Sequence, residues 1–353
     1  MLLRYLKKIF YNSVAELRMI KSVSIQNWGP ISNLQCQRLG RINLLVGKNG
    51  IGKTQAVKAL YTAVNATEQY KRGIEHRSIA QLLTDKLYRT FMPKKIGELV
   101  KKGENELQFE MRDEKDRMLK FRFGKDTASQ IQNVENTYEP CDTNSIFIPA
   151  KEIISLQSLI LESRSAKFNM PGFDDTYLDL ALALTPAYRG RNYKEFAEVR
   201  KVLKSAIGGK VEYDEERKEW YFSDDKHRVY GIALASEGIK KMSVVDVLLG
   251  NHFLTPESIV FIDEFEAALH PQLIARFAEM VVALSQKGIQ FFITTHSYAA
   301  VKKFYILAHK NEIDIPFLSF EEDDIKIHNL REGLPDNPII QESVKLYMEE
   351  LDL

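Results

Sequence analysis

Eight residues early in the chain have the types and spacing of a loop that binds phosphate groups. Residues 47–54 are GKNGIGKT and fit the pattern G-x-x-x-x-G-K-[ST]. Glycines let the backbone turn its N–H groups toward phosphate oxygens, and the N-terminus of a following helix favours an anion. Lys53 would reach the β- and γ-phosphates, and the Thr54 hydroxyl would bind Mg²⁺. The segment therefore predicts a site for a nucleoside triphosphate, with a plain glycine turn as the alternative. The expected nucleotide contacts are Gly47, Asn49, Gly50, Gly52, Lys53, Thr54 and Gln55.

Two acids follow an apolar run much later in the chain. Residues 258–264 are SIVFIDE, which predicts a buried parallel strand that delivers Asp263 and Glu264 to the carboxyl edge of a sheet. Asp263 would bind Mg²⁺ directly or through water. Glu264 would orient and polarise an attacking water, because phosphoryl transfer depends mainly on positioning and charge. An apolar run that ends in acids by chance is the alternative.

A histidine follows the next apolar run. Residues 289–294 predict a strand, and TTHS at 294–297 closes it. A neutral His296 at the sheet edge would hydrogen-bond a γ-phosphate or hold the attacking water. The simpler interpretation is a polar residue with an ordinary hydrogen-bond partner. Together the motifs favour hydrolysis, with Lys53, Glu264 and His296 as its catalytic side chains.

Local patterns place these motifs on regular elements. The apolar run at 42–46 predicts a buried strand before the loop, and 54–64 has helical spacing after it. Two alternating segments, 20–28 and 31–37, predict an antiparallel strand pair that precedes the loop. We expect a further hairpin around residues 113–116. The remaining predicted elements are helices within 79–91, 151–206 and 193–206, a hairpin around 211–222, and a hairpin whose turn is the acidic cluster 321–324.

Composition narrows the class of protein. A chain of 353 residues suggests two domains, or one nucleotide-binding domain with an insertion. The net charge of +1 gives no overall electrostatic signal for nucleic acid, although the lysine-rich stretch 68–104 leaves a local DNA contact open. Cys36 and Cys141 have no metal-ligand spacing and suggest no disulfide framework, which favours the cytoplasm.

No run of apolar residues is long enough to span a membrane. Residues 1–18 predict a packed or frayed amphipathic helix, with contact to a membrane surface or partner as the alternative.

The order of motifs resembles a known family. GKNGIGKT, then IDEFEAALHP, then ITTHS is similar to ATP-binding-cassette (ABC) ATPases of the RecF, SMC and overcoming-lysogenization-defect (OLD) class, as is the opening IKSVSIQNWGPI. The resemblance implies ATP and Mg²⁺ as cofactors, and a short motif at a helix N-terminus that completes the partner subunit's ATP site. The best match is 234–241, LASEGIKK, in which Ser236 and Gly238 would face the partner's nucleotide. An ordinary serine N-cap is the alternative. The glutamine that this class uses after the strand at 145–148 is missing, which leaves Lys151 and Glu152 as substitutes.

These observations predict an α/β fold, a P-loop NTPase with an ABC-ATPase-like head. The head would contain an antiparallel β lobe and a central, mostly parallel sheet flanked by helices, with a helical lobe inserted. The expected divisions are 1–18 for an N-terminal helical extension, 19–150 for the first part of the head, 151–230 for the helical lobe with its hairpin, and 231–353 for the rest of the head.

The function that we expect is an ATP-hydrolysing switch that dimerises with nucleotide bound. Family analogy suggests that it regulates a separately encoded nuclease or toxin in defence against phage. A RecF- or SMC-like DNA-binding or repair ATPase stays open as an alternative, as does a nuclease in its own right that uses the acidic cluster 321–324. The segment EFEAALHP at 264–271 argues against a transporter subunit.

Overall fold

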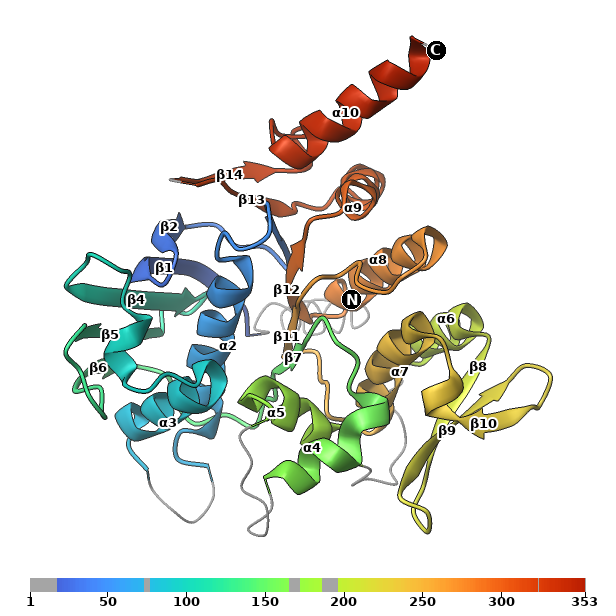
Figure 1. Ribbon diagram of the computed structural model, residues 1–353, viewed down its shortest axis with the longest axis horizontal. Coiled ribbons are helices and arrows are strands. Elements are labelled where there is room, and N and C mark those ends of the chain that lie inside the picture. Colours follow the sequence, from blue (N-terminus) through green and yellow to red (C-terminus); the bar gives the residue numbers. More distant parts are fainter. Residues whose placement is uncertain (1–17, 73–76, 165–171, 186–195, 323, 353) are drawn as a thin grey trace, which may run out of the picture.

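The computed structural model describes residues 18–72, 77–164, 172–185, 196–322 and 324–352. A six-stranded sheet crosses the middle of the molecule, with helices on both of its faces (Figure 1). Its strand order is β14-β13-β3-β12-β11-β7. Neighbouring strands from β13 to β7 are parallel, and only the edge strand β14 runs antiparallel, against β13. The strands are β3 (Ile42–Val46), β7 (Ile146–Ile148), β11 (Ile259–Ile262), β12 (Gln290–Thr295), β13 (Pro316–Phe320) and β14 (Ile325–Asn329).

An antiparallel lobe lies beside one face of this sheet. Its strand order is β2-β1-β4-β5-β6. The strands are β1 (Ile20–Trp28), β2 (Ile31–Cys36), β4 (Glu106–Asp113), β5 (Met118–Gly124) and β6 (Asn133–Asn136). Helix α2 (Lys53–Gln69), α3 (Ile79–Phe91) and the 3-10 turn η1 (Ile96–Leu99) complete this half of the molecule. Trp28 is fully buried in its core, with the rings of Phe109 and Phe121 each 6.2 Å away between centroids.

The central sheet separates two hydrophobic cores because its side chains alternate between faces. On β12, Phe292 joins the core of the β lobe and α2, whereas Phe291 and Ile293 join the opposite core. A strand buried on both faces needs an almost continuous apolar run, and β3 and β11 each have one. Strand β12 has the shorter run FFI, and its Gln290, Thr294 and Thr295 are also buried.

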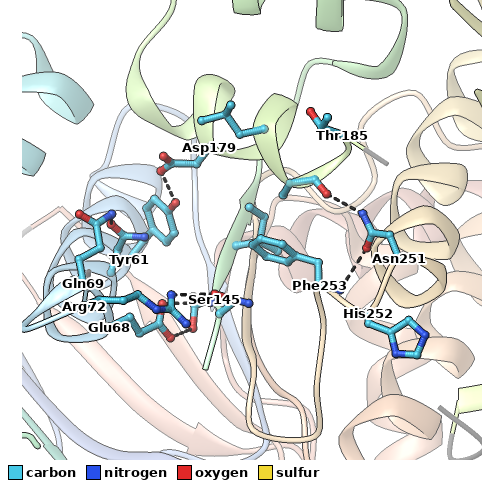
Figure 2. A pocket seen from close by; sticks show the side chains of 15 residues that line it. Tyr61, Glu68, Gln69, Arg72, Ser145, Asp179, Thr185, Asn251, His252 and Phe253 are labelled. Carbon is cyan, nitrogen blue, oxygen red and sulfur yellow. Dashed lines mark hydrogen bonds between the residues drawn. The ribbon is translucent and has the colours of Figure 1, made fainter. Parts of the chain in front are cut away.

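The far end of α2 is anchored by buried charges. The Arg18 guanidinium contacts the Glu68 carboxylate at 2.8 Å, and Glu68 also accepts a hydrogen bond of 2.7 Å from the Ser145 hydroxyl just before β7. Beside this anchor lies a cavity of about 430 Å³ between α2, α5 (Asp175–Ala183) and the loop after α7 (Glu237–Gly250) (Figure 2). The cavity is at the opposite end of α2 from residues 47–54.

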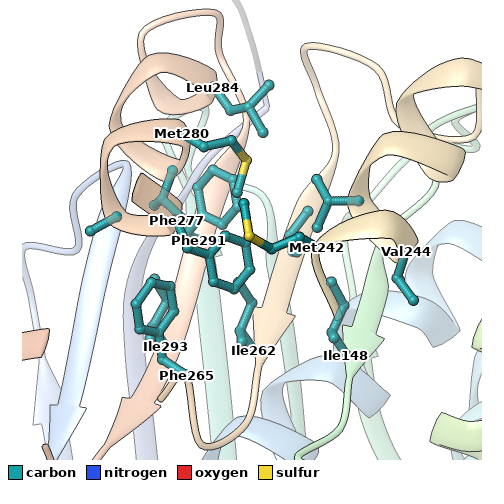
Figure 3. Close-up of a cluster of buried hydrophobic side chains, with 14 of the residues drawn as sticks. Ile148, Met242, Val244, Ile262, Phe265, Phe277, Met280, Leu284, Phe291 and Ile293 are labelled. Carbon is teal, nitrogen blue, oxygen red and sulfur yellow. The ribbon is translucent and has the colours of Figure 1, made fainter. Parts of the chain in front are cut away.

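The helical lobe packs on the second core with the helices after it. Met242, Phe265, Phe277 and Met280 belong to this core together with Phe291 (Figure 3). The elements of this half are η2 (Ile154–Leu156), α4 (Gln157–Ser163), α5, α6 (Ala197–Ile207), β8 (Gly209–Asp214), β9 (Glu219–Asp224), β10 (Val229–Gly231), η4 (Ile232–Leu234), α7 (Glu237–Gly250), α8 (Pro271–Ser285) and α9 (Tyr298–Asn311). The last helix, α10 (Pro338–Leu351), projects away from the head (Figure 1).

Two sequence expectations need an addition or a restriction. The hairpin expected around 211–222 forms between β8 and β9, and β10 adds a third strand by pairing with β9 along residues 229–231. Helix α6 begins at Ala197, and residues 193–195 of the expected helix lie outside the described part, as do residues 1–17. No helix among the described residues is long and apolar enough to cross a membrane.

Candidate functional site

The glycine-rich loop joins β3 to α2 at the carboxyl edge of the central sheet. Gly52 stands at the N-cap of α2 with a φ of 108°, in the left-handed region that favours glycine. A Cβ at this position would lie 2.9 Å from Ile31 Cγ1 and 3.0 Å from Pro30 Cγ. The glycine therefore allows the β1–β2 turn to pack directly against the loop. Gln55 also faces this turn, with its side-chain amide against Gly29.

Lys53 lies inside the loop that it follows. Its side chain is 7% exposed, and Nζ donates to the carbonyl oxygens of Gly47 and Lys48 at 2.6 and 2.7 Å. Burial lowers the pKa of Lys53, while the nearby carboxylates, Asp263 first, act in the opposite direction. A buried ammonium held only by carbonyl oxygens is suited to a phosphate anion, which would give it a charged partner.

Thr54 and Asp263 are brought together from positions more than two hundred residues apart. The Thr54 hydroxyl donates to Asp263 Oδ1 at 2.8 Å, and the Thr294 hydroxyl donates to the same oxygen at 2.7 Å. These contacts join the loop to the ends of β11 and β12. The arrangement follows from the sheet order, because β12 lies between β3 and β11.

The pair fits a magnesium ion that arrives with a nucleotide. Mg²⁺ is usually held by one or two protein oxygens together with phosphate oxygens and water. Thr54 and Asp263 supply one hydroxyl and one carboxylate at mutual hydrogen-bond distance. Across the described ranges, no cluster of three or more His, Cys, Asp or Glu side chains could hold a metal by itself. The phosphates would therefore complete the coordination.

The backbone of Glu264 is fixed by two side chains. Its N–H donates to the Thr294 hydroxyl at 2.8 Å, and its carbonyl accepts from Lys241 Nζ at 2.7 Å. Glu264 has a φ of 45°, uncommon for a residue with a side chain, and these contacts support that conformation.

Lys241 is a buried residue of this site that sequence reasoning missed. Burial lowers its pKa to about 8, and the carboxylates of Glu266, Asp263 and Glu264 limit that shift. In the sequence, Lys241 is one of two consecutive lysines on a helix, and such lysines are usually exposed to solvent. The burial of Lys241 becomes visible only when α7 packs against the end of β11.

His296 lies at the end of β12 and borders the loop. Its side chain is 43% exposed and contacts the carboxylate of Glu266, with Nδ1 and Oε1 3.0 Å apart. A cavity of about 700 Å³ is lined by Lys48, His296, Tyr298 and the first turns of α10. A second cavity, of about 250 Å³, is lined by Gly47, Lys48, Ile51 and residues of β13 and the start of α10. Asn49 and Gly50 are exposed at the tip of the loop.

Ser236 and Gly238 lie elsewhere on the surface, at the N-terminus of α7. The Ser236 side chain is exposed and accepts from Ile239 N at 3.4 Å, so it caps the helix. Gly238 is buried, and a Cβ there would lie 2.9 Å from Leu273 Cδ1. Neither residue lines the cavities beside the loop. The structure therefore brings Lys53, Thr54 and Asp263 together at the loop, with His296 at its border. Ser236 and Gly238 lie outside this group.

The segment after β7 has no glutamine at the expected place. Glu152 lies 3.8 Å from Lys240 Nζ on α7, whereas Lys151 is exposed. Gln157, a few residues later, has a structural role. It donates to Ala181 O at 2.7 Å and accepts from the Trp220 indole at 2.6 Å. Of the two proposed substitutes, Glu152 is the one in contact with α7.

Comparison with known proteins agrees with this geometry. Residues 42–302 match the family model described as "AAA domain, putative AbiEii toxin, Type IV TA system". No curated protein matched the chain. Three solved structures match the chain, at identities that concern at most the fold. The Smc head bound to the C-winged helix domain of ScpA has a TM-score of 0.53 at 14% identity, over 88% of this chain and 97% of that chain.

Two further structures extend this comparison. The Smc head domain with an extended coiled coil, bound to the C-terminal domain of ScpA derived from Pyrococcus furiosus, gives 0.53 at 12% identity, over 96% and 100% of the two chains. RecF with ATP gives a TM-score of 0.43 at 13% identity, over 88% and 99% of the two chains.

The matched family region contains the loop, both acids and His296. The predicted α/β head fold and the resemblance to P-loop ATPase heads of the SMC kind are confirmed, and this class of ATPase binds nucleotide with a divalent metal. The chain belongs to the family "AAA domain, putative AbiEii toxin, Type IV TA system".

Proposed function

We propose that the chain binds ATP with Mg²⁺ and hydrolyses it to ADP and phosphate. The observation that carries this proposal is the contact of Thr54 with Asp263. Thr294 connects this contact to β12, the strand that ends just before His296. A hydroxyl and a carboxylate meet there beside a buried lysine within a glycine-rich loop. That combination suits a metal-bound triphosphate.

Each side chain would have a distinct role in the reaction. Loop amides and Lys53 would bind the β- and γ-phosphates, and Lys53 would exchange its carbonyl partners for phosphate oxygens. Thr54 and Asp263 would hold Mg²⁺, which neutralises charge on the phosphates. Glu264 would orient the attacking water, and His296 would contact the γ-phosphate or that water.

We further propose that two copies close around two ATP molecules. Ser236 is exposed at the start of α7 and outside the cavities of its own loop, which supports a role toward a second copy. Leu234, two residues earlier, is 79% exposed, and an exposed leucine beside a helix N-terminus suits a contact surface. Removal of the γ-phosphate would delete contacts between copies, so nucleotide state and dimerisation would be linked.

The switch would regulate a separately encoded effector, a nuclease or toxin, in the cytoplasm during defence against phage. The family description names a toxin and a toxin–antitoxin system, which supports a partnership of this kind. The Smc heads with a related fold bind a domain of another protein, ScpA. Cys36 and Cys141 are both free thiols, in keeping with a reducing compartment. Co-purification of the native complex would identify the effector.

The test of the switch is light scattering on a Glu264→Gln protein. This change removes the group that orients water and keeps the loop, so ATP and Mg²⁺ should double the mass at micromolar concentration. Lys53→Ala provides the control, because it should stay monomeric under the same conditions. An unchanged mass for Glu264→Gln, with ATP shown to be bound, would rule out the sandwich.

A further inference from the structure

One carboxylate near the loop has no role in the site described so far. Glu266 lies two residues beyond Glu264, and its side chain is 10% exposed. Both of its oxygens are engaged by the end of β12. Oε2 accepts from the Thr295 hydroxyl at 2.6 Å, and Oε1 accepts from the backbone N–H of His296 at 2.7 Å. The His296 ring approaches the same Oε1, with Nδ1 at 3.0 Å.

This arrangement favours a proton on one particular ring nitrogen of His296. A carboxylate accepts hydrogen bonds and does not donate them, so the Glu266 oxygen 3.0 Å from Nδ1 favours the tautomer with its proton on Nδ1. In that neutral form Nε2 keeps its lone pair. The backbone contact to the same oxygen adds a second constraint, because it holds the carboxylate at the residue that bears the ring.

We infer that Glu266 is the positioning residue for His296: it fixes the ring orientation and the Nδ1-protonated tautomer, and so leaves Nε2 for the reacting groups. His296 borders the cavity that it shares with Lys48 of the loop. A neutral Nε2 would accept a hydrogen bond from the attacking water. Once protonated, Nε2 would donate to a γ-phosphate oxygen, with the positive ring balanced by Glu266. This inference rests on the proposed ATPase function for its consequence, but not for its geometry.

The geometry also separates Glu266 from its neighbour Glu264. Glu264 is held by Lys241 and Thr294 through its backbone, and these contacts do not involve its carboxylate. The carboxylate of Glu266 is committed to Thr295 and His296. The two acids therefore have different tasks although only Phe265 lies between them.

The first arm of the test needs no nucleotide. Nitrogen-15 NMR of the imidazole rings separates the two neutral tautomers, and the chain has seven histidines. A His296→Gln protein identifies the His296 signals by their loss. We expect Nδ1 to be the protonated nitrogen in the wild type. Glu266→Leu, which removes the acceptor, should shift His296 toward protonation at Nε2. The Nε2-protonated form in the wild type, or an unchanged tautomer in Glu266→Leu, would overturn the inference.

The second arm measures ATP turnover. For Glu266→Gln we expect kcat to fall about 10- to 100-fold, the range for groups that orient a functional histidine, with KM for ATP within about threefold of wild type. Thr295→Val removes the contact to Oε2 and keeps the contact to His296, so its kcat should fall by less than about threefold. An equal fall of kcat in both variants would mean that Glu266 only stabilises the end of β12, and would contradict the inference.

Glu279→Gln serves as the matched control for loss of one glutamate charge. Glu279 pairs with Lys303 on the surface between α8 and α9, and its turnover should equal that of the wild type. Thermal melting of all variants checks their folding. If the wild type hydrolyses no ATP, the proposed function fails while the NMR arm still decides the role of Glu266.

Discussion

Lys241 is a cation in an interior that favours its neutral form. Its pKa is lowered to about 8 from an ordinary value of 10.5, chiefly by burial. The shift corresponds to a cost of about 3 kcal/mol for the charged form in the folded state. Three carboxylates, those of Glu266, Asp263 and Glu264, keep that cost from being larger. Its hydrogen bond to the Glu264 carbonyl partly offsets the cost of burying the charge.

Stability should therefore depend on pH through Lys241, with a defined sign. Between pH 8 and 10.5 the unfolded chain holds a proton on Lys241 that the folded chain has released, so this group makes unfolding harder as pH rises. Below pH 8 both states are protonated, and the cost of the buried charge is fully present. A Lys241→Met protein lacks this dependence. Its stability relative to the wild type should be highest near neutral pH and should decline by about 1–2 kcal/mol toward pH 9.5.

Urea unfolding of both proteins at pH 7 and pH 9.5 measures this difference. The lost hydrogen bond to Glu264 is the same at both pH values, so only the change in the difference matters. If the two proteins differ in unfolding free energy by the same amount at both pH values, the pKa of Lys241 is not lowered in the folded state.

The loop and the β1–β2 turn depend on each other at the scale of elements. Gly50 and Gly52 both have positive φ, at 78° and 108°. A Cβ at Gly50 would meet nothing within 4 Å, whereas one at Gly52 would press on Pro30 and Ile31. Gly50→Ala should therefore cost only the backbone strain of about 1–2 kcal/mol. Gly52→Ala should cost about 1–3 kcal/mol more, because overpacking adds to the strain.

The two glycine variants form a matched pair for chemical denaturation. Nucleotide affinity gives a second measurement, since displacement of the β1–β2 turn should weaken ATP binding in Gly52→Ala more than in Gly50→Ala. Equal destabilisation by the two substitutions would show that the β1–β2 turn can move away from residue 52 without loss of stability.

Local pattern was sufficient for most elements and for half of the site. Strand β1 and helix α3 have the bounds that alternation and helical spacing predict, 20–28 and 79–91. Strand β10 was missed because it has only three residues, and none of them is buried. Helix α10 was not predicted. Only Ile340 on it is buried, so no core-facing stripe marks it as a packed helix.

The missed functional groups are those defined by tertiary contact. Lys241 meets the carbonyl of Glu264 across twenty-three residues, and Glu266 meets His296 across thirty. Spacing within a segment carries no information about such pairs. Thr54 and Asp263 were assigned to one ion because their motifs imply it, and their contact at 2.8 Å agrees with that assignment.

The whole molecule presents two separate faces that the proposed reaction would need to combine. The loop, Asp263 and His296 occupy the carboxyl edge of the central sheet, and Ser236 caps the exposed start of α7. Lys241 joins these faces within one chain, since it lies on α7 and holds the backbone of Glu264. A second copy that contacts Ser236 would therefore act on the same helix that supports the acid of the first copy.

Mixing two inactive proteins tests whether each site is shared between copies. Lys53→Ala destroys the loop half of a site, and Ser236→Arg destroys the half offered to the partner. A mixed dimer then contains one intact site, built from the loop of the Ser236→Arg chain and Ser236 of the Lys53→Ala chain. Random pairing makes half of the dimers mixed, so the equimolar mixture should regain about one quarter of the wild-type ATPase rate. Lys53→Ala mixed with Asp263→Asn supplies the control, because both changes damage the same half and no pairing restores a site. Turnover in the first mixture that does not exceed the control would mean that one chain hydrolyses ATP without the Ser236 of another.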